Sequence, residues 1–269
     1  VPVGADGRWF AAGRATSSAA GGGDGPHAAG AAASLTGTDA VATPAGPLSV
    51  VFFGLFTPLQ GATTIARALG SLAGTGGTVA LNNNAALTVN QSVDTSYAGA
   101  ITGTGGLIKT GSGTLTLTGT SSYSGGTTVS GGGLTLGSSS TMAKLVGALT
   151  ADGGTVSVVN ADLSGMGAIT ARNGGLLGFG SSTSAAAAAL LVADASSTLA
   201  FAGNSTAGTS TITNSGRMTI AEAASGGAAR YIGNGGSDLS IAGVAGSGTT
   251  IGSIEGSGTV SLGAKPLSL

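Results

Sequence analysis

The sequence has few of the side chains on which most enzymes and nucleic-acid-binding proteins depend. It has no cysteine and a single histidine, and only 7% of its 269 residues are charged. The absence of cysteine excludes disulfide bonds, and one histidine does not supply the ligands of an ordinary zinc or redox-metal centre. Nine lysine and arginine residues, scattered along the chain, do not form the basic face that a nucleic acid requires. We therefore expect no nucleic-acid partner, no cofactor site and no metal site.

Long apolar runs are also missing, since no stretch approaches the ~18 consecutive apolar residues of a transmembrane helix. The nearest candidate is residues 48–56, which lie between Pro47 and Pro58. The core of a signal peptide can be this short, but it follows a basic segment at the chain start. Here Arg8 and Arg14 lie far upstream. We expect a strand or an end-cap over 48–56 and no membrane-spanning segment in this chain.

The residues that are abundant favour an all-β protein. Glycine occurs 53 times, and alternating aliphatic residues and threonines are typical of strands separated by glycine turns. Residues 1–68 are rich in alanine, glycine and proline and show no repeat, so we interpret them as an irregular leader or end-cap. Residues 69–269 are repetitive, and we assign them to one β-helical segment.

The repeats consist of two apolar residues that flank one small or polar residue. One set contains Leu115/Leu117, Leu134/Leu136, Val156/Val158, Leu177/Phe179, Leu199/Phe201, Met218/Ile220, Leu239/Ile241 and Val260/Leu262. Its successive members are 19 to 22 residues apart. A second set, at a similar interval, contains Val129, Leu149, Ile169, Leu191, Ile212, Ile232 and Ile251.

This spacing predicts a parallel β-helix with about 21 residues per coil, enough for three short strands and three turns. Coils would stack about 4.8 Å apart. Leu115 would then lie on Leu134, while Thr114, Thr116 and Thr118 would point outward. The tract Ala185–Ala189 alone favours a helix, but Leu191 keeps the repeat phase, so we predict a strand or bulge there.

One segment carries a motif. Residues 103–119 read GTGGLIKTGSGTLTLTG, and a tyrosine segment, YSGGTTV at 123–129, and then GLTLG at 133–137 follow. This closely resembles the passenger-associated transport repeat of bacterial autotransporters, the type V secretion systems. Weaker modules of the same kind occur at 206–214 and 252–263, and residues 70–76 resemble the last of these.

The resemblance implies a right-handed parallel β-helix. It further implies that the chain is exported across the inner membrane and then through the pore of a C-terminal outer-membrane barrel. It also implies that segment 103–137 acts as an early folded template. We expect a piece of a passenger domain, located at the bacterial outer membrane on its extracellular side or secreted. Its expected partners are the barrel of the same precursor and a host or cell-surface ligand.

We expect a non-catalytic structural stalk or adhesin with no catalytic residue. Two alternatives remain open at this stage. One is the scaffold of an enzyme passenger, such as a polysaccharide lyase or a protease, whose catalytic part lies outside this chain. The other is a module that binds a glycan or a host protein.

Few charged residues are spaced at the repeat interval. Asp152, Arg172 and Asp194 are 20 and 22 residues apart and would stack on three successive coils. Such a set favours a surface ion ladder over the carboxylate cleft of a lyase, because a calcium site needs more acidic residues on one face. Asn214 and Asn234 are 20 residues apart, and we predict a structural amide ladder.

Other motifs carry no chemistry. His27 is the only histidine and lies in the predicted leader, which argues against a Ser-His-Asp triad in the β-helix. The Gly103-x-Gly105 pair lacks a following helix and a ribose-binding acid, so it does not predict a dinucleotide site. The outward threonine row at 114–118 does not persist in the next coils, which argues against an ice-binding face.

Overall fold

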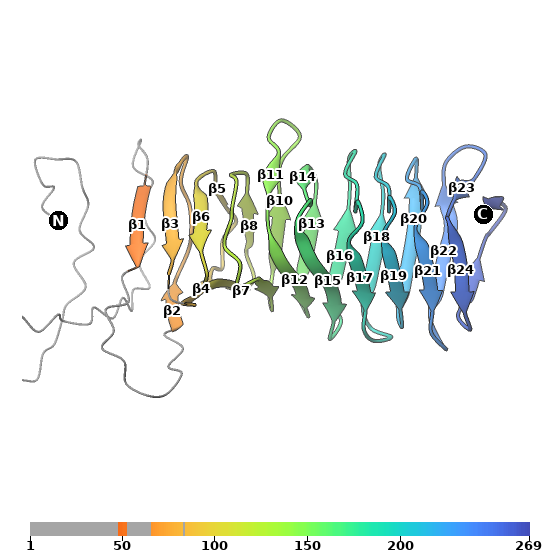
Figure 1. Cartoon of the computed structure of the whole chain (residues 1–269), viewed down its shortest axis with the longest axis horizontal. Helices are drawn as coiled ribbons and strands as arrows, with labels where there is room; N and C mark the ends of the chain where they lie inside the picture. The colour runs from red at the N-terminus through yellow and green to blue at the C-terminus, as the bar shows by residue number, and fades with distance from the viewer. Residues whose placement is uncertain (1–47, 53–65, 83) are drawn as a thin grey trace, which may run out of the picture.

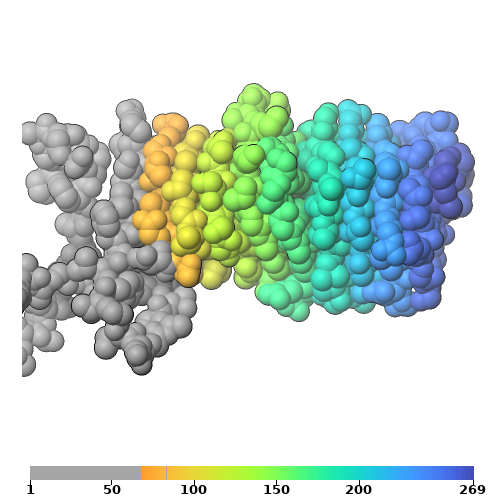
Figure 2. All heavy atoms as spheres, viewed as in Figure 1, coloured from red at the N-terminus to blue at the C-terminus, as the bar shows by residue number. Residues whose placement is uncertain are grey.

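The molecule is an elongated column of stacked strands (Figures 1 and 2). This computed structural model describes residues 48–52, 66–82 and 84–269. Every regular element in the described residues is a β-strand, and their strand pairing is parallel. No helix in this part of the chain is long and apolar enough to cross a membrane. The parallel β-helix with about 21 residues per coil is therefore confirmed.

Two long sheets form two sides of the column. The first sheet has ten strands, in the spatial order β2 (Ala66–Leu69), β4 (Ala86–Asn90), β7 (Gly106–Thr110), β9 (Thr127–Val129), β12 (Gly147–Asp152), β15 (Met166–Arg172), β17 (Ala189–Val192), β19 (Thr211–Asn214), β21 (Arg230–Gly233) and β24 (Ser253–Gly256). The second sheet has nine strands, in the order β25 (Thr259–Ser261), β22 (Asp238–Val244), β20 (Arg217–Glu222), β18 (Thr198–Phe201), β16 (Leu176–Phe179), β13 (Thr155–Val158), β10 (Gly133–Leu136), β8 (Thr114–Leu117) and β5 (Thr95–Tyr97).

The third side of the column is less regular. Near the N-terminal end it is a three-stranded sheet of β1 (Leu48–Phe52), β3 (Gly77–Leu81) and β6 (Ala100–Gly103). Further along, two strand pairs remain, β11 (Ala143–Lys144) with β14 (Ala161–Asp162) and β23 (Thr249–Thr250) with β26 (Leu267–Ser268). Isolated bridges such as Ser184 to Thr206 connect the coils between them. Three strands per coil thus form only in part, because this side is mostly glycine- and serine-rich turns.

Strand pairing begins within the segment assigned to the leader. Strand β1 pairs with β3, and β2 pairs with β4. The strand predicted over 48–56 is confirmed for Leu48–Phe52. Residues 1–47 and 53–65, which include His27, lie outside the described residues.

The first predicted set of stacked residues is confirmed. Leu115 pairs with Leu134, and the same register continues through Val156, Leu177, Leu199, Met218, Leu239 and Val260. Up to Leu239 these side chains are buried. The outward residues Thr114, Thr116 and Thr118 are partly exposed, as predicted. At the C-terminal end Leu262 differs from the prediction, because it follows β25 and is 39% exposed.

The second predicted set is wrong at several coils. Leu149 and Ile169 stack as expected, but the next inward residue is Leu190, because Leu191 points outward. Ala185–Ala188 is a turn region in which Ala186 has a φ of 53°, so the strand begins only at Ala189. Leu190 and Leu191 are adjacent, and the alternation pattern alone does not decide which of the two faces inward.

The same shift occurs in later coils. Tyr231, rather than Ile232, pairs with Ile212. Ile254 in β24 then pairs with Tyr231, whereas Ile251 precedes that strand. At the start of the set, Val129 pairs with Ala151 and not with Leu149.

The interior is a continuous column of aliphatic side chains with few aromatic rings. Phe179 and Phe201 lie in adjacent strands, and their rings stack at a centroid distance of 4.8 Å. Stacked aromatic pairs of this kind add about 0.5–1.5 kcal/mol beyond the apolar area that they bury. At the corner after β10, Gly137 has a φ of +79°, and a side chain there would meet the backbone oxygen of Asn160. Glycine is therefore required at that corner.

Candidate functional site

The segment with the family motif occupies strands β7 to β10 and the turns between them. Its inward positions alternate along each strand, from Leu107 and Lys109 in β7 to Leu115 and Leu117 in β8. All four side chains are buried. The motif therefore encodes interior residues and corner glycines, and its exposed side chains are serines and threonines.

Lys109 is the most unusual residue of this segment, because its side chain is fully buried. Its Nζ atom donates to the backbone oxygens of Thr110 at 2.6 Å, Gly111 at 3.3 Å and Gly131 at 3.3 Å. An ammonium group has three donors, so these three carbonyls satisfy it completely. Burial lowers the pKa of Lys109 below its usual value, and the negative charge of Asp94 partly offsets this.

The tyrosine of the motif is also an interior residue. Tyr123 is fully buried, and its hydroxyl forms a hydrogen bond with the hydroxyl of Thr127. Burial raises the pKa of Tyr123 well above its usual range. In the preceding coil, burial raises the pKa of Tyr97 to about 12. Both phenols therefore stay protonated at neutral pH and serve as packing groups with one polar contact each.

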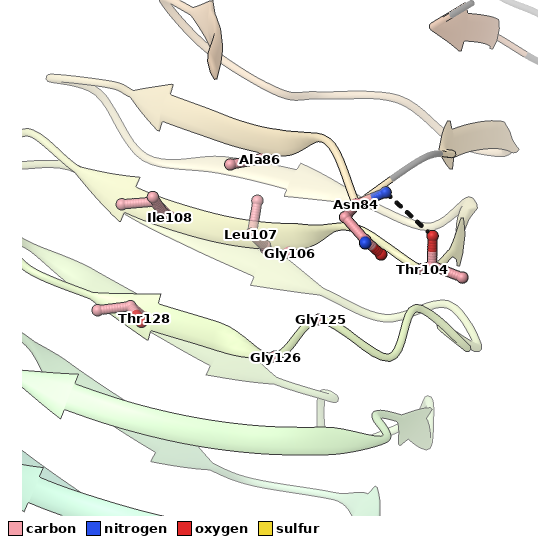
Figure 3. Close-up of a pocket in the computed structure, with 9 residues that line it drawn as sticks. All are labelled: Asn84, Ala86, Thr104, Gly106, Leu107, Ile108, Gly125, Gly126 and Thr128. Carbon is pink, nitrogen blue, oxygen red and sulfur yellow. Dashed lines mark hydrogen bonds between the residues drawn. The ribbon is translucent and has the colours of Figure 1, made fainter. Parts of the chain in front are cut away.

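A shallow hollow lies on the outer face of the ten-stranded sheet, over the same coils (Figure 3). Ala86, Gly106 and Gly126 have little or no side chain, while Ile108 and Thr128 border the hollow along the strands. At one end, the backbone N–H of Asn84 donates to the Thr104 hydroxyl at 3.1 Å. Gly125 and Leu107 complete the lining, which holds no titratable side chain. The hollow offers hydrogen-bonding and apolar contacts and no acid or base.

The predicted charged column forms only in part. Asp152 and Arg172 are register partners in β12 and β15, and Arg172 Nη2 lies 2.9 Å from Asp152 Oδ2. Asp194 does not extend this ion pair, because its Oδ2 accepts the backbone N–H of Asn173 at 2.6 Å. The side chain of Asn173 in turn donates to Asp152 at 2.6 Å. The three coils are thus linked through Asn173, a residue that the spacing of charges did not indicate.

The electrostatics of this corner are those of a hydrogen-bonded turn. The hydrogen bond from Asn173, followed by that from Arg172, holds the pKa of Asp152 below its usual value. The hydroxyl of Ser196 is the main group that lowers the pKa of Asp194, to about 2. Both carboxylates are therefore charged at neutral pH, and neither has the raised pKa of a general acid. Among the described residues, no group of three or more His, Cys, Asp or Glu is arranged to hold a metal ion.

The two predicted asparagines have separate structural roles. Asn214 is buried, and its side-chain amide donates to the Tyr231 hydroxyl at 2.9 Å. Its register partner in β21 is Gly233, so it does not stack on Asn234. The side chain of Asn234 donates instead to Ser215 at 2.8 Å. In place of the predicted amide ladder, each asparagine forms its own hydrogen bond with a residue of an adjacent coil.

Sequence reasoning missed Lys109 and Gln91 as interior polar residues. The signal for Lys109 was present, since it lies two residues after the inward Leu107 and so shares its face. Gln91 lies just after the end of β4; its amide donates to the backbone oxygen of Thr114 at 2.8 Å, and its amide oxygen accepts from the Thr95 hydroxyl at 3.2 Å. The contact with Thr114 depends on the following coil and is not apparent from the local pattern.

Comparison with known families agrees with this geometry. The family model described as passenger-associated-transport-repeat matches residues 107–136, which run from β7 to the end of β10. This repeat is characteristic of autotransporter passenger domains, so the chain carries an autotransporter passenger repeat inside a β-solenoid. Searches of curated proteins and of solved structures gave no significant match.

Proposed function

We propose that this chain is a non-catalytic passenger segment that serves as a structural stalk or adhesin, secreted or displayed at the bacterial surface. The observation that carries the proposal is that the transport repeat is built into a continuous stack of parallel coils. Nine steps of about 4.8 Å give the ten-stranded sheet a length of about 43 Å. A column of this kind holds its two ends apart without further partners, which suits a stalk.

The chemistry of the described surface supports the non-catalytic part of the proposal. Apart from the buried Lys109, the charged groups that have shifted pKa values are surface carboxylates and their partners, and their pKa shifts favour the charged forms. The most unusual titratable groups, Lys109 and Tyr123, are buried and bonded within the column. A catalytic group needs access to its substrate, and these have none.

The low charge and the lack of cysteine also suit export. A chain with no disulfide and few charged groups can pass through a narrow pore unfolded and then fold coil upon coil. Each added coil buries an aliphatic layer against the previous one, so folding outside the cell is favourable at every step. The barrel that provides the pore belongs to the same precursor in this family.

The test uses a precursor in which this chain lies between a signal peptide and an autotransporter barrel. In intact Gram-negative cells, we expect added protease to reach the chain at the cell surface. Deletion of 107–126 removes one coil in register, since Leu107 pairs with Thr127, and should slow the appearance of folded chain. Deletion of 177–198 is the matched control, since Leu177 pairs with Leu199.

Two results would overturn the proposal. One is retention of the chain in the periplasm with a barrel that exports other passengers. The other is turnover by the purified chain, seen as cleavage of a polysaccharide or a protein substrate. Equal export kinetics for the two deletions would remove only the template role of the transport repeat.

A further inference from the structure

The interior of the column repeats so closely that its apolar residues do not specify one stacking register. One inward column of the ten-stranded sheet is apolar or small except at two positions. Its members are Val89, Lys109, Val129, Ala151, Ala171, Val192, Asn214 and Gly233. Lys109 and Asn214 are therefore the two members of this column that have specific polar partners.

A shift of one strand by two residues is the alternative that such a pattern permits. A shift by one residue turns every inward side chain outward and is strongly disfavoured, but a shift by two keeps the faces unchanged. In the native register Thr127 faces Leu107 and Val129 faces Lys109. After a two-residue shift Val129 would face Leu107 instead, so an inward residue would still meet an inward residue. Apolar burial alone distinguishes these two arrangements weakly.

Lys109 distinguishes them strongly, because its three acceptors come from two coils. Thr110 and Gly111 belong to the coil of Lys109, whereas Gly131 belongs to the next coil. A two-residue shift moves Gly131 by about 6.6 Å along the strand direction. Its oxygen would then leave hydrogen-bond range, and one N–H of a buried ammonium would lack a partner.

We propose that Lys109 is a positioning residue that sets the register between the coils of β7 and β9. The buried ammonium accepts only the stacking that brings the Gly131 carbonyl to it. Among the described residues it forms no salt bridge, so the carbonyls are its direct partners. This role concerns how the coils stack and goes beyond the proposed surface function.

The absence of cysteine from the chain allows a direct measurement of register by disulfide formation. Ile108 and Thr128 are outward register partners in adjacent strands, where α-carbons about 4.8 Å apart can form a disulfide. Ser130 is two residues further along, about 8 Å from Ile108, and is too distant unless the strand has shifted. The pairs Ile108→Cys/Thr128→Cys and Ile108→Cys/Ser130→Cys therefore report the native and the shifted register.

Each pair is introduced into the 269-residue chain with and without Lys109→Met and oxidised to equilibrium in a glutathione buffer. We expect the chain with Lys109 to form the native disulfide. With Lys109→Met, the ratio of shifted to native disulfide should rise at least about tenfold, the size of one lost hydrogen bond to a charged donor. Lys144→Met, which removes a surface lysine paired with Asp162, should leave the ratio unchanged.

Three results would overturn the proposal. The first is an unchanged disulfide ratio in Lys109→Met, and the second is an equal rise in Lys144→Met. If Lys109→Met does not fold, Lys109→Leu is measured in the same way. The third result is that neither variant folds, because Lys109 would then be needed for stability and not for the choice between registers.

Discussion

Replacing one interior leucine tests the central physical claim, that stacked aliphatic layers hold the column together. Leu134 is fully buried and lies between its register partners Leu115 and Val156. Core Leu→Ala substitutions cost about 2–5 kcal/mol, depending on how far the site collapses. Here the backbone hydrogen bonds of two flanking strands hold the cavity open. We therefore expect Leu134→Ala to lower the free energy of unfolding by about 3–4 kcal/mol.

The measurement is equilibrium unfolding in urea, followed by circular dichroism, with Thr135→Ala as the matched control. Thr135 is the next residue and points outward, so its replacement should cost less than about 1 kcal/mol. An equal loss for the two variants would refute the layered core. So would a loss of under about 1 kcal/mol for Leu134→Ala.

A double-mutant cycle extends the same reasoning to the distance over which coils interact. Val156 is in the coil next to Leu134, whereas Leu199 is three strand steps away, about 14 Å. In a stacked-repeat protein each repeat contacts only its neighbours. The Leu134/Val156 alanine pair should show a coupling of about 0.5–3 kcal/mol, and the Leu134/Leu199 pair should be additive within about 0.5 kcal/mol. Equal coupling in both pairs would contradict nearest-neighbour stacking.

Three further outcomes are expected from urea unfolding. Burial raises the pKa of Tyr97 to about 12, so the protonated phenol stabilises the fold below pH ~10. This stability is lost as the pH rises from about 10 to 12, and Tyr97→Phe should reduce the loss. The Ser196 hydroxyl helps to lower the pKa of Asp194 to about 2 from its ordinary value of 3.8. The stability that the charged carboxylate contributes is therefore present above pH 3.8 and is lost as the pH falls toward 2. Asp194→Asn should remove this small acid dependence of the free energy of unfolding. Leu190→Ala should cost about 2–5 kcal/mol, whereas Leu191→Ala should cost under about 1 kcal/mol, because only Leu190 is buried.

Each of these outcomes has a clear opposite. Identical pH profiles for the original chain and Tyr97→Phe between pH 10 and 12 would show that the phenol is not buried. An unchanged acid profile in Asp194→Asn would mean that its hydrogen bonds do not stabilise the fold. A larger loss of stability in Leu191→Ala than in Leu190→Ala would support the prediction from the repeat interval, in which Leu191 faces inward.

The fold was predictable because strand alternation and the repeat interval are both local properties of the sequence. Leu115 and Leu134 could be placed on one another because each belongs to a clear alternating pair. The charged corner was less predictable. The spacing of Asp152 and Arg172 predicted that they would stack, and they form an ion pair. The link to Asp194 was not predictable, because it passes through Asn173, whose backbone has a φ of 54° and whose N–H donates to the Asp194 carboxylate.

The sequence by itself determined that the chain is a stack of short parallel strands with an aliphatic interior and an autotransporter passenger repeat. Period-two alternation selects strands, and the interval of about 21 residues selects coils. Only the tertiary structure decided which of Leu190 and Leu191 faces inward and that Lys109 lies in the interior. The reason is that a side chain's place in a coil depends on the coils above and below it. An ammonium group is stable inside the column only where carbonyls from two such coils converge on it.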